Sequence, residues 1–122
     1  MVSVKVEIES QFLADESEPD EQEFVFAYHV RIVNDGDVGV RVMRRYWFIE
    51  DGSGRDTEVE GEGVVGQTPY IAPNDHYRYT SFARLEAPVG RMSGHYWVET
   101  DTGETVKIEI PPFTLKADRW VH

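Results

Sequence analysis

The chain has 122 residues, of which 12 are basic and 23 acidic, giving a formal net charge of −11, and it contains no cysteine. The lack of cysteine excludes disulfides, thiolate metal sites and a cysteine nucleophile, and it fits a reducing compartment. The negative charge disfavours binding to nucleic-acid phosphates, and no apolar run approaches the roughly 20 residues that span a bilayer. We therefore expect one cytoplasmic domain over residues 1–122, without a secretory signal and with neither nucleic acid nor membrane as a partner.

The first third of the chain alternates between apolar and polar residues. Residues 2–12 have the period of a half-buried strand. Residues 23–34 predict a second strand with one apolar and one semi-apolar face, which suits a central strand. Between them, residues 14–21 carry five acids and a proline and predict an exposed loop. This loop lacks the ligand spacing and the turn glycine of a calcium site, so no metal is predicted there. The Asp35-Gly36 step after the second strand is typical of a tight hairpin turn.

The middle of the chain predicts an aromatic strand over about residues 38–50. Its apolar residues change sides along the strand, and one extra residue near Met43-Arg44, a β-bulge, would bring them to one face. We expect Trp47 to lie in the core, where a large aromatic holds packed sheets together. The chain then turns over residues 51–54 and runs back through residues 57–59.

The last half of the chain adds more short strands. Residues 67–75 predict a loop with one short apolar contact, and residues 76–83, 91–100 and 105–110 predict strands separated by turns. Pro111-Pro112 should end regular pairing on at least one side, with a last short pairing over residues 113–115. About seven strands without a helical pattern predict an all-β, antiparallel β-sandwich.

One short motif has the letters of a ligand site. Gly61, Gly63 and Gly66 match the spacing G-x-G-x-x-G, which in dinucleotide-binding folds presents helix amides to a pyrophosphate. Here a proline and poor helix formers follow, and Glu60 and Glu62 would repel an anion. These neighbours favour a structural role for the glycines, which would permit bends in a loop crossing between sheets.

A weaker anion site at the same loop remains an alternative. Backbone amides of residues 61–66 could form a nest for pyrophosphate or a nucleotide, with Arg45 or Arg55 neutralising the charge. The three glycines and these two arginines are the one candidate ligand-binding site in the sequence. No cofactor and no metal site are predicted.

The remaining reactive residue types do not form a catalytic pattern. The four histidines show no short ligand spacing, and the serines lie in no nucleophile-elbow context. We therefore predict that the protein is not an enzyme. Exposed aromatic residues could instead contact a sugar or a protein, and the candidates are Trp97, Tyr70 and the terminal Trp120-Val121-His122.

Six blocks of the sequence are together similar to one bacterial protein family. They are FVFAY (24–28), RYW (45–47), GRDTEV (54–59), GEGVVG (61–66), GHY (94–96) and IPPFTL (110–115). In this order, and spread over nearly the whole chain, they resemble the ApaG family, also called DUF525. The resemblance implies an immunoglobulin-like or fibronectin type III-like sandwich. It also implies family-level links to cobalt resistance and magnesium efflux, and related domains in eukaryotic proteins are thought to mediate protein contacts.

The residues and the resemblance lead to one functional hypothesis and one alternative. The hypothesis is a non-enzymatic binding module that recognises an unidentified protein through a sheet face or long loops, as a monomer or homodimer. The alternative is a protein that binds pyrophosphate or a nucleotide through the loop at residues 61–66.

Overall fold

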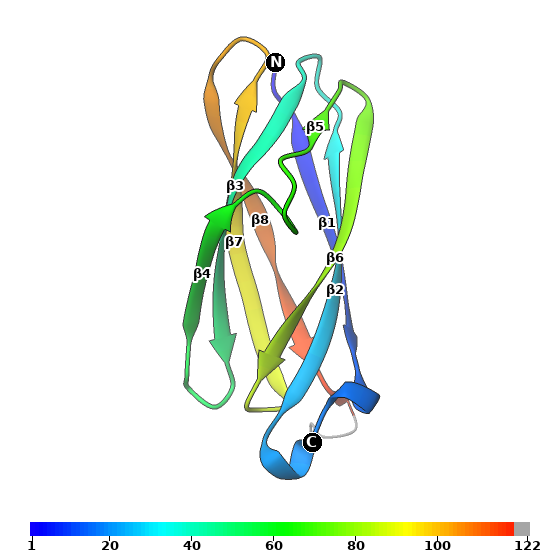
Figure 1. Ribbon diagram of the computed structural model, residues 1–122, viewed down its shortest axis with the longest axis vertical. Helices are drawn as coiled ribbons and strands as arrows, with labels where there is room; N and C mark the ends of the chain where they lie inside the picture. The colour runs from blue at the N-terminus through cyan, green and yellow to red at the C-terminus, as the bar shows by residue number, and fades with distance from the viewer. Residues whose placement is uncertain (119–122) are drawn as a thin grey trace.

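Figure 1 shows the computed structural model of the chain, in which residues 1–118 are described. Two antiparallel sheets pack face to face in an immunoglobulin-like sandwich, as the sequence predicts. The first sheet has the order β1 (Val4–Phe12), β2 (Phe24–Asn34), β6 (Asp75–Leu85). The second has the order β4 (Thr57–Glu62), β3 (Val40–Asp51), β7 (Val89–Thr100), β8 (Thr105–Lys116), and the short β5 (Tyr70–Ile71) pairs with β3. These eight strands of the described residues include β5, which the sequence indicated only as a short apolar contact.

The core lies between the two sheets and is rich in aromatic side chains. Trp47 is 2% exposed, which confirms its predicted place in the core. Its ring lies edge-on to Tyr28 at 5.4 Å and to Phe113 at 5.9 Å between ring centroids. Tyr28 comes from the first sheet and Phe113 from the second, so this cluster joins the sheets.

The predicted bulge is present in β3. The register of β3 with β7 shifts between Val42 and Arg44, and one extra residue reverses the facing of every later side chain. Val42 and Trp47 are five positions apart and would face opposite sides of a regular strand, but with the bulge both are buried. Arg45 lies two residues before Trp47 and therefore shares its inward face, toward the space between the sheets.

The predicted hairpin at Asp35-Gly36 is wrong, because the chain crosses there to the other sheet. β2 pairs with β1 and β6, whereas β3 belongs to the second sheet. The crossing is held by the buried side chain of Asn34, whose amide donates to the carbonyls of Val38 at 2.9 Å and Ile71 at 3.0 Å. The Asp-Gly step signals a turn, but the hydrogen bonds of Asn34 decide where the next strand goes.

β8 runs through Pro111 and Pro112 rather than ending there. Its register with β7 shifts between Met92 and Gly94, opposite these prolines, and the pairing resumes at Met92 and Phe113. β8 lies at the edge of its sheet, so a residue without an N–H is tolerated at such a bulge. The predicted last pairing over residues 113–115 is the continuation of the same strand.

The acidic stretch after β1 forms two short 3₁₀ turns, η1 (Ala14–Glu16) and η2 (Pro19–Glu21). On one side of the sandwich β1 contacts β8, and Ser10 Oγ donates to the carbonyl of Thr114 at 2.9 Å. On the opposite side β4 and β6 are the sheet edges (Figure 1).

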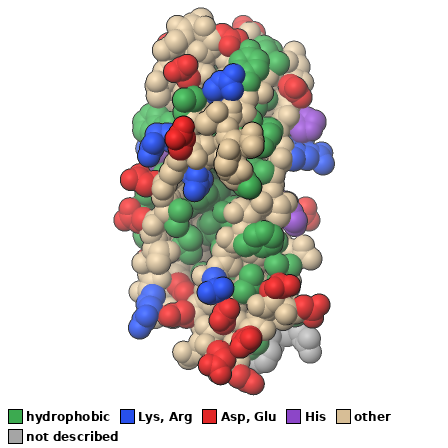
Figure 2. Space-filling model, viewed as in Figure 1, with side chains coloured by type: hydrophobic (Ala, Val, Ile, Leu, Met, Phe, Trp, Pro, Cys, Tyr) green, Lys and Arg blue, Asp and Glu red, His purple; other side chains and the backbone are tan. Residues whose placement is uncertain are grey.

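Figure 2 shows hydrophobic side chains in a hollow between the sheets, and acidic side chains gathered at the end that carries η1 and η2. Within residues 1–118 no helix has the length and apolarity to cross a bilayer.

Candidate functional site

The glycine-rich loop after β4 forms a tight turn. Val64 and Gln67 exchange backbone hydrogen bonds of 2.8 and 2.9 Å, and Val65 and Gly66 between them have φ values of +46° and +76°. Positive φ at both central positions is typical of a type I′ turn. The chain then leads to β5, not to a helix. The geometry that gives a G-x-G-x-x-G fingerprint its pyrophosphate site is therefore replaced by a turn.

Several polar groups of this loop are already used inside the protein. The Gly63 N–H donates to the Met43 carbonyl at 2.7 Å, and the Val64 and Gln67 amides donate to each other's carbonyls. Arg45 donates from Nη1 to the carbonyls of Glu62 at 3.0 Å and Gly63 at 3.1 Å. The guanidinium of Arg45 thus stabilises the loop through its carbonyls.

The structure brings only one of the two predicted arginines to the loop. Arg45 lies opposite Gly61 in register, and a Cβ at Gly61 would be 3.0 Å from both terminal nitrogens of Arg45. Glycine at this position leaves room for the guanidinium. Arg55 precedes the first residue of β4, so roughly 20 Å of extended strand separates it from the loop. There its Nε is 3.4 Å from a carboxylate oxygen of Glu86.

Arg45 also adjoins buried tyrosines in the core. The hydroxyls of Tyr79 and Tyr96 are hydrogen-bonded to each other. Burial raises the pKa of both hydroxyls far above the ordinary tyrosine value, and the positive charge of Arg45 offsets only a small part of this. Both hydroxyls stay protonated at neutral pH and fix the packing of β6 against β7.

The outer face of the second sheet carries a cluster of rings, which we call the aromatic face: Tyr46, Phe48, His95 and Trp97. The bulge at Met43 turns Tyr46 and Phe48 outward while Trp47 points inward. Tyr46 and His95 are stacked at 4.9 Å, and His95 meets Trp97 edge-on at 5.6 Å between centroids. Tyr46, Phe48 and His95 also line a hollow of about 470 Å³ that reaches the two prolines of β8.

Carboxylates border the aromatic face along its edge strand. Glu58, Glu60 and Glu62 lie opposite Phe48, Tyr46 and Arg44 in register, in a line along β4. Burial and the carboxylates of Glu58 and Glu60 raise the pKa of Tyr46.

On the other side of Tyr46, burial and the nearby Lys107 lower the pKa of His95, so its ring is neutral at pH 7. Lys107 Nζ lies 6.0 Å from the centroid of the Trp97 ring, a cation–π distance. The face is therefore uncharged at Tyr46, Phe48 and His95 and negative along the edge formed by β4. At its Trp97 end it also carries the cations of Arg44 and Lys107.

Of the aromatic face, Trp97 was a predicted contact residue, whereas Tyr46, Phe48 and His95 were not predicted. Trp97 is 37% exposed and lies on it. Tyr70 is also exposed, but it lies at another end of the sheet, where its hydroxyl donates to Asp101 at 2.9 Å and Arg41 covers its ring. The outward facing of Tyr46 and Phe48 follows from the bulge combined with the inward Trp47, and this was the signal that could have found them.

Other predicted candidates have different outcomes. The tail Trp120-Val121-His122 lies outside the described residues. His29 contacts Thr80 and Gln11 on the first sheet, far from His95 on the second. Among residues 1–118 no three histidine or acidic side chains are grouped so that they could hold a metal ion.

Comparison with known proteins gives consistent matches. The family model described as ApaG domain matches residues 14–100. Protein ApaG of Erwinia tasmaniensis is 45% identical over 119 residues, covering 98% of this chain and 95% of that protein. Protein ApaG of Enterobacter sp. (strain 638) is 43% identical with the same coverage. The crystal structure of a putative ApaA protein from Bordetella pertussis superimposes with a TM-score of 0.93 at 38% identity, covering 97% of this chain and 96% of that one.

Proposed function

The chain belongs to the ApaG domain family, and from this membership and the geometry of its second sheet we propose that it is a non-enzymatic module that binds a basic segment of another protein on the aromatic face. The observation that carries the proposal is the solvent-facing cluster of Tyr46, Phe48, His95 and Trp97 beside a line of glutamates. Protein interfaces are enriched in such aromatic residues at their centre, with polar groups around them.

The charge of the face defines the kind of partner. Glu58, Glu60 and Glu62 lie on one edge, and the whole chain has a net charge of −11. A segment with lysine or arginine next to an aliphatic or aromatic residue would neutralise the edge and cover the rings. Opposite charges also steer the encounter and so raise the association rate.

The resemblance to the family also carries links to cobalt resistance and magnesium efflux. We propose that the protein contributes to cobalt resistance and magnesium efflux through the partner that it binds, and not through a reaction that it catalyses. A Trp97→Ala chain that no longer binds should then lose any such contribution, whereas a chain changed elsewhere on its surface should keep it.

The alternative, an anion held by the loop at residues 61–66, has weaker support. The amides of Gly63, Val64 and Gln67 donate inside the protein, and Arg45 already contacts two loop carbonyls. An anion there would have to displace these bonds or use only the tip of the turn.

A peptide selection tests the proposed function. Random peptides displayed on phage are selected on the full chain, and we expect enrichment of basic residues flanking an apolar one. A selected peptide should bind Trp97→Ala roughly tenfold or more weakly than the wild type in calorimetry, because aromatic residues at the centre of an interface commonly contribute more than 1 kcal/mol.

Phe82→Ala is the matched control for this experiment. Phe82 is an aromatic residue that is 64% exposed, but it lies on β6 of the other sheet. Its variant should bind the peptide as the wild type does. Equal losses for both variants, or selected peptides without basic residues, would contradict the proposal. Amide shifts confined to residues 61–66 would support the alternative instead.

A further inference from the structure

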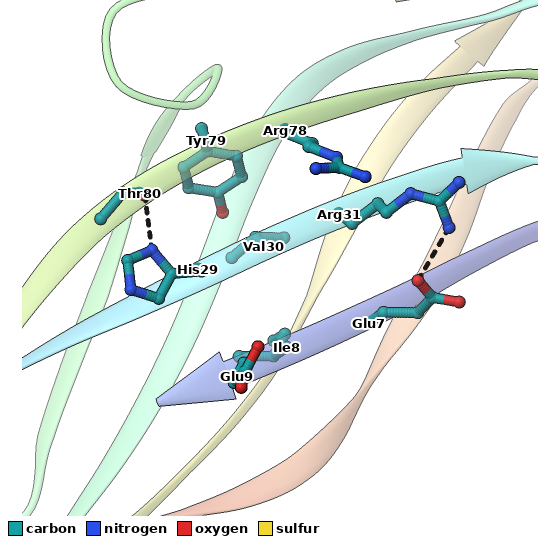
Figure 3. Close-up of a pocket in the computed structure, with 9 residues that line it drawn as sticks. All are labelled: Glu7, Ile8, Glu9, His29, Val30, Arg31, Arg78, Tyr79 and Thr80. Atoms are coloured by element: carbon teal, nitrogen blue, oxygen red, sulfur yellow. Dashed lines mark hydrogen bonds and ion pairs between the residues drawn. The ribbon is translucent and has the colours of Figure 1, made fainter. Parts of the chain in front are cut away.

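The outer face of the first sheet places two arginines directly opposite each other. Arg31 of β2 and Arg78 of β6 are cross-strand partners in register, and Figure 3 shows the side chain of Arg78 reaching toward Arg31. Like charges at directly opposite positions destabilise a sheet. Such a pair is the more unusual in a chain whose net charge is −11.

The contacts of the two arginines leave positive charge and donors unused. Arg31 Nη1 donates to Glu7 Oε1 at 2.9 Å, across to β1. Its Nε is buried and has no hydrogen-bond partner in the described part of the chain. The side chain of Arg78 is exposed and forms no hydrogen bond or ion pair with any residue from 1 to 118. Among residues 1–118, Glu7 is therefore the one carboxylate that forms an ion pair with either guanidinium group.

The two arginines line a hollow with a partly fixed wall. Its volume is about 730 Å³, and its polar lining consists of Glu7, Glu9, His29, Arg31, Arg78 and Thr80. His29 is held from both ring nitrogens, by the Thr80 hydroxyl at 2.8 Å and by Gln11 Oε1 at 3.3 Å. Figure 3 shows Glu7 beside Arg31, and His29 with Thr80 farther along the same strands.

We propose that this hollow binds a phosphate group, with the guanidinium of Arg78 as its main ligand and Arg31 as a second cation. The planar fork of arginine matches the oxygens of phosphate and forms two charge-assisted hydrogen bonds at once. Phosphate has enough oxygens to accept from two guanidiniums, whereas a carboxylate is satisfied by one fork. An anion between the arginines would also remove their mutual repulsion.

The surroundings define the size and the strength of this site. The hollow is larger than a phosphate ion, so it has room for a phosphate that is esterified to a small molecule. Glu7 and Glu9 line the same hollow and oppose the anion, which keeps the affinity moderate. The site lies on the other sheet from the aromatic face, and it uses none of the residues of the glycine loop.

Titration of the full chain with phosphate compounds tests this inference. Amide NMR spectra are recorded with inorganic phosphate, glycerol phosphate and acetate at constant ionic strength. We expect saturable shifts at residues 29–31 and 78–80 with the two phosphates and weaker or no binding of acetate. Tighter binding of glycerol phosphate than of phosphate would identify an ester as the ligand, and equal binding would identify the free ion.

Variants of β6 separate a site from general charge effects. Arg78→Met should bind phosphate roughly ten- to a hundredfold more weakly, because charge-assisted hydrogen bonds are lost. Arg84→Met is the matched control: Arg84 is on the same face of β6, is 71% exposed and has its Nε 3.4 Å from Glu23 Oε1. This control should bind as the wild type does.

A stability measurement provides a second readout. Phosphate should raise the Tm of the wild type and of Arg84→Met but not that of Arg78→Met, since a ligand stabilises only the chain that binds it. Arg78→Met without phosphate should be at least as stable as the wild type, because the repulsion with Arg31 is gone. Binding by Arg78→Met at wild-type strength, or acetate binding as tightly as phosphate, would overturn the inference, and so would shifts located at residues 61–66.

Discussion

Gly63 and Gly66 have similar backbone angles but different surroundings. Their φ values are +64° and +76°. A Cβ at Gly63 would lie 2.1 Å from the Gln67 carbonyl oxygen, whereas a Cβ at Gly66 would have no atom within 4 Å. The left-handed conformation costs an alanine about 1–2 kcal/mol at either position, and only Gly63 adds a clash with backbone atoms.

Alanine substitution should therefore separate the two glycines. We expect Gly66→Ala to lower the free energy of unfolding by about 1 kcal/mol and Gly63→Ala to lower it by at least about 1–3 kcal/mol more, since overpacking adds to the backbone cost. Urea unfolding of both variants measures the difference. Equal losses would mean that the turn relaxes around the new methyl group.

The sequence identifies these glycines but not their role. The spacing of Gly61, Gly63 and Gly66 is the same whether a loop holds a pyrophosphate or only turns back on itself. What decides between these is the partner of each amide and the position of Arg45, and both depend on residues that are distant in sequence. For the same reason the pair of Arg31 and Arg78 was not predictable, because it depends on the register of β2 with β6.

At the level of strands, local patterns predicted more than connections did. The bulge near Met43 was predictable because the apolar residues of β3 change sides around it, and Trp47 in the core follows from the same pattern. The crossing after Asn34 was not predictable, because an Asp-Gly step fits both a hairpin and a crossing. The difference lies in carbonyls that become close to Asn34 only in the folded chain.

β4 is an edge strand whose outer backbone groups are open to pairing. The Gly63 N–H donates to Met43 in β3, and Gly61 lies opposite Arg45. Hydrogen-bonded pairs alternate along an antiparallel ladder, so the backbone groups of Glu58 and Glu60 point away from β3. Charged side chains on such an edge keep it from pairing with other chains.

Removing these charges should cause self-association. We expect a chain with Glu58→Thr, Glu60→Thr and Glu62→Thr to form dimers or larger species in sedimentation velocity, since threonine also favours strands. The control carries the same three changes at Glu16, Glu18 and Glu21, which lie outside the long strands. If both triple variants associate equally, lower net charge is the cause and not the edge of β4.

On the scale of the whole molecule, the buried tyrosines predict a limit at alkaline pH. Burial raises the pKa of Tyr79 and Tyr96 above the ordinary value of about 10. The folded chain therefore keeps two protons that the unfolded chain releases. Their contribution to stability is complete below pH ~10 and is lost as the pH rises further.

Denaturation at different pH values measures this linkage. We expect the urea midpoint to fall steeply above pH ~10, and tyrosinate absorbance of the buried rings to appear only as the chain unfolds. Tyr79→Phe should have a shallower dependence on pH, although it leaves the Tyr96 hydroxyl without its partner. Ionisation of all six tyrosines near pH ~10 in a chain that stays folded would contradict the expectation.

The crossing at Asn34 has a consequence for how the chain reaches this structure. β2 pairs Phe24 with Leu85 and Asn34 with Asp75 of β6, and the three strands between β2 and β6 in sequence belong to the other sheet. The closing of such long loops is what makes sandwich proteins fold in milliseconds to seconds. During synthesis on the ribosome, β1 and β2 emerge together and can pair early. The edge of β2 that pairs with β6 then stays open until β6 has been made, and the apolar inner face of β2 stays uncovered. In that interval the nascent chain is most exposed to aggregation.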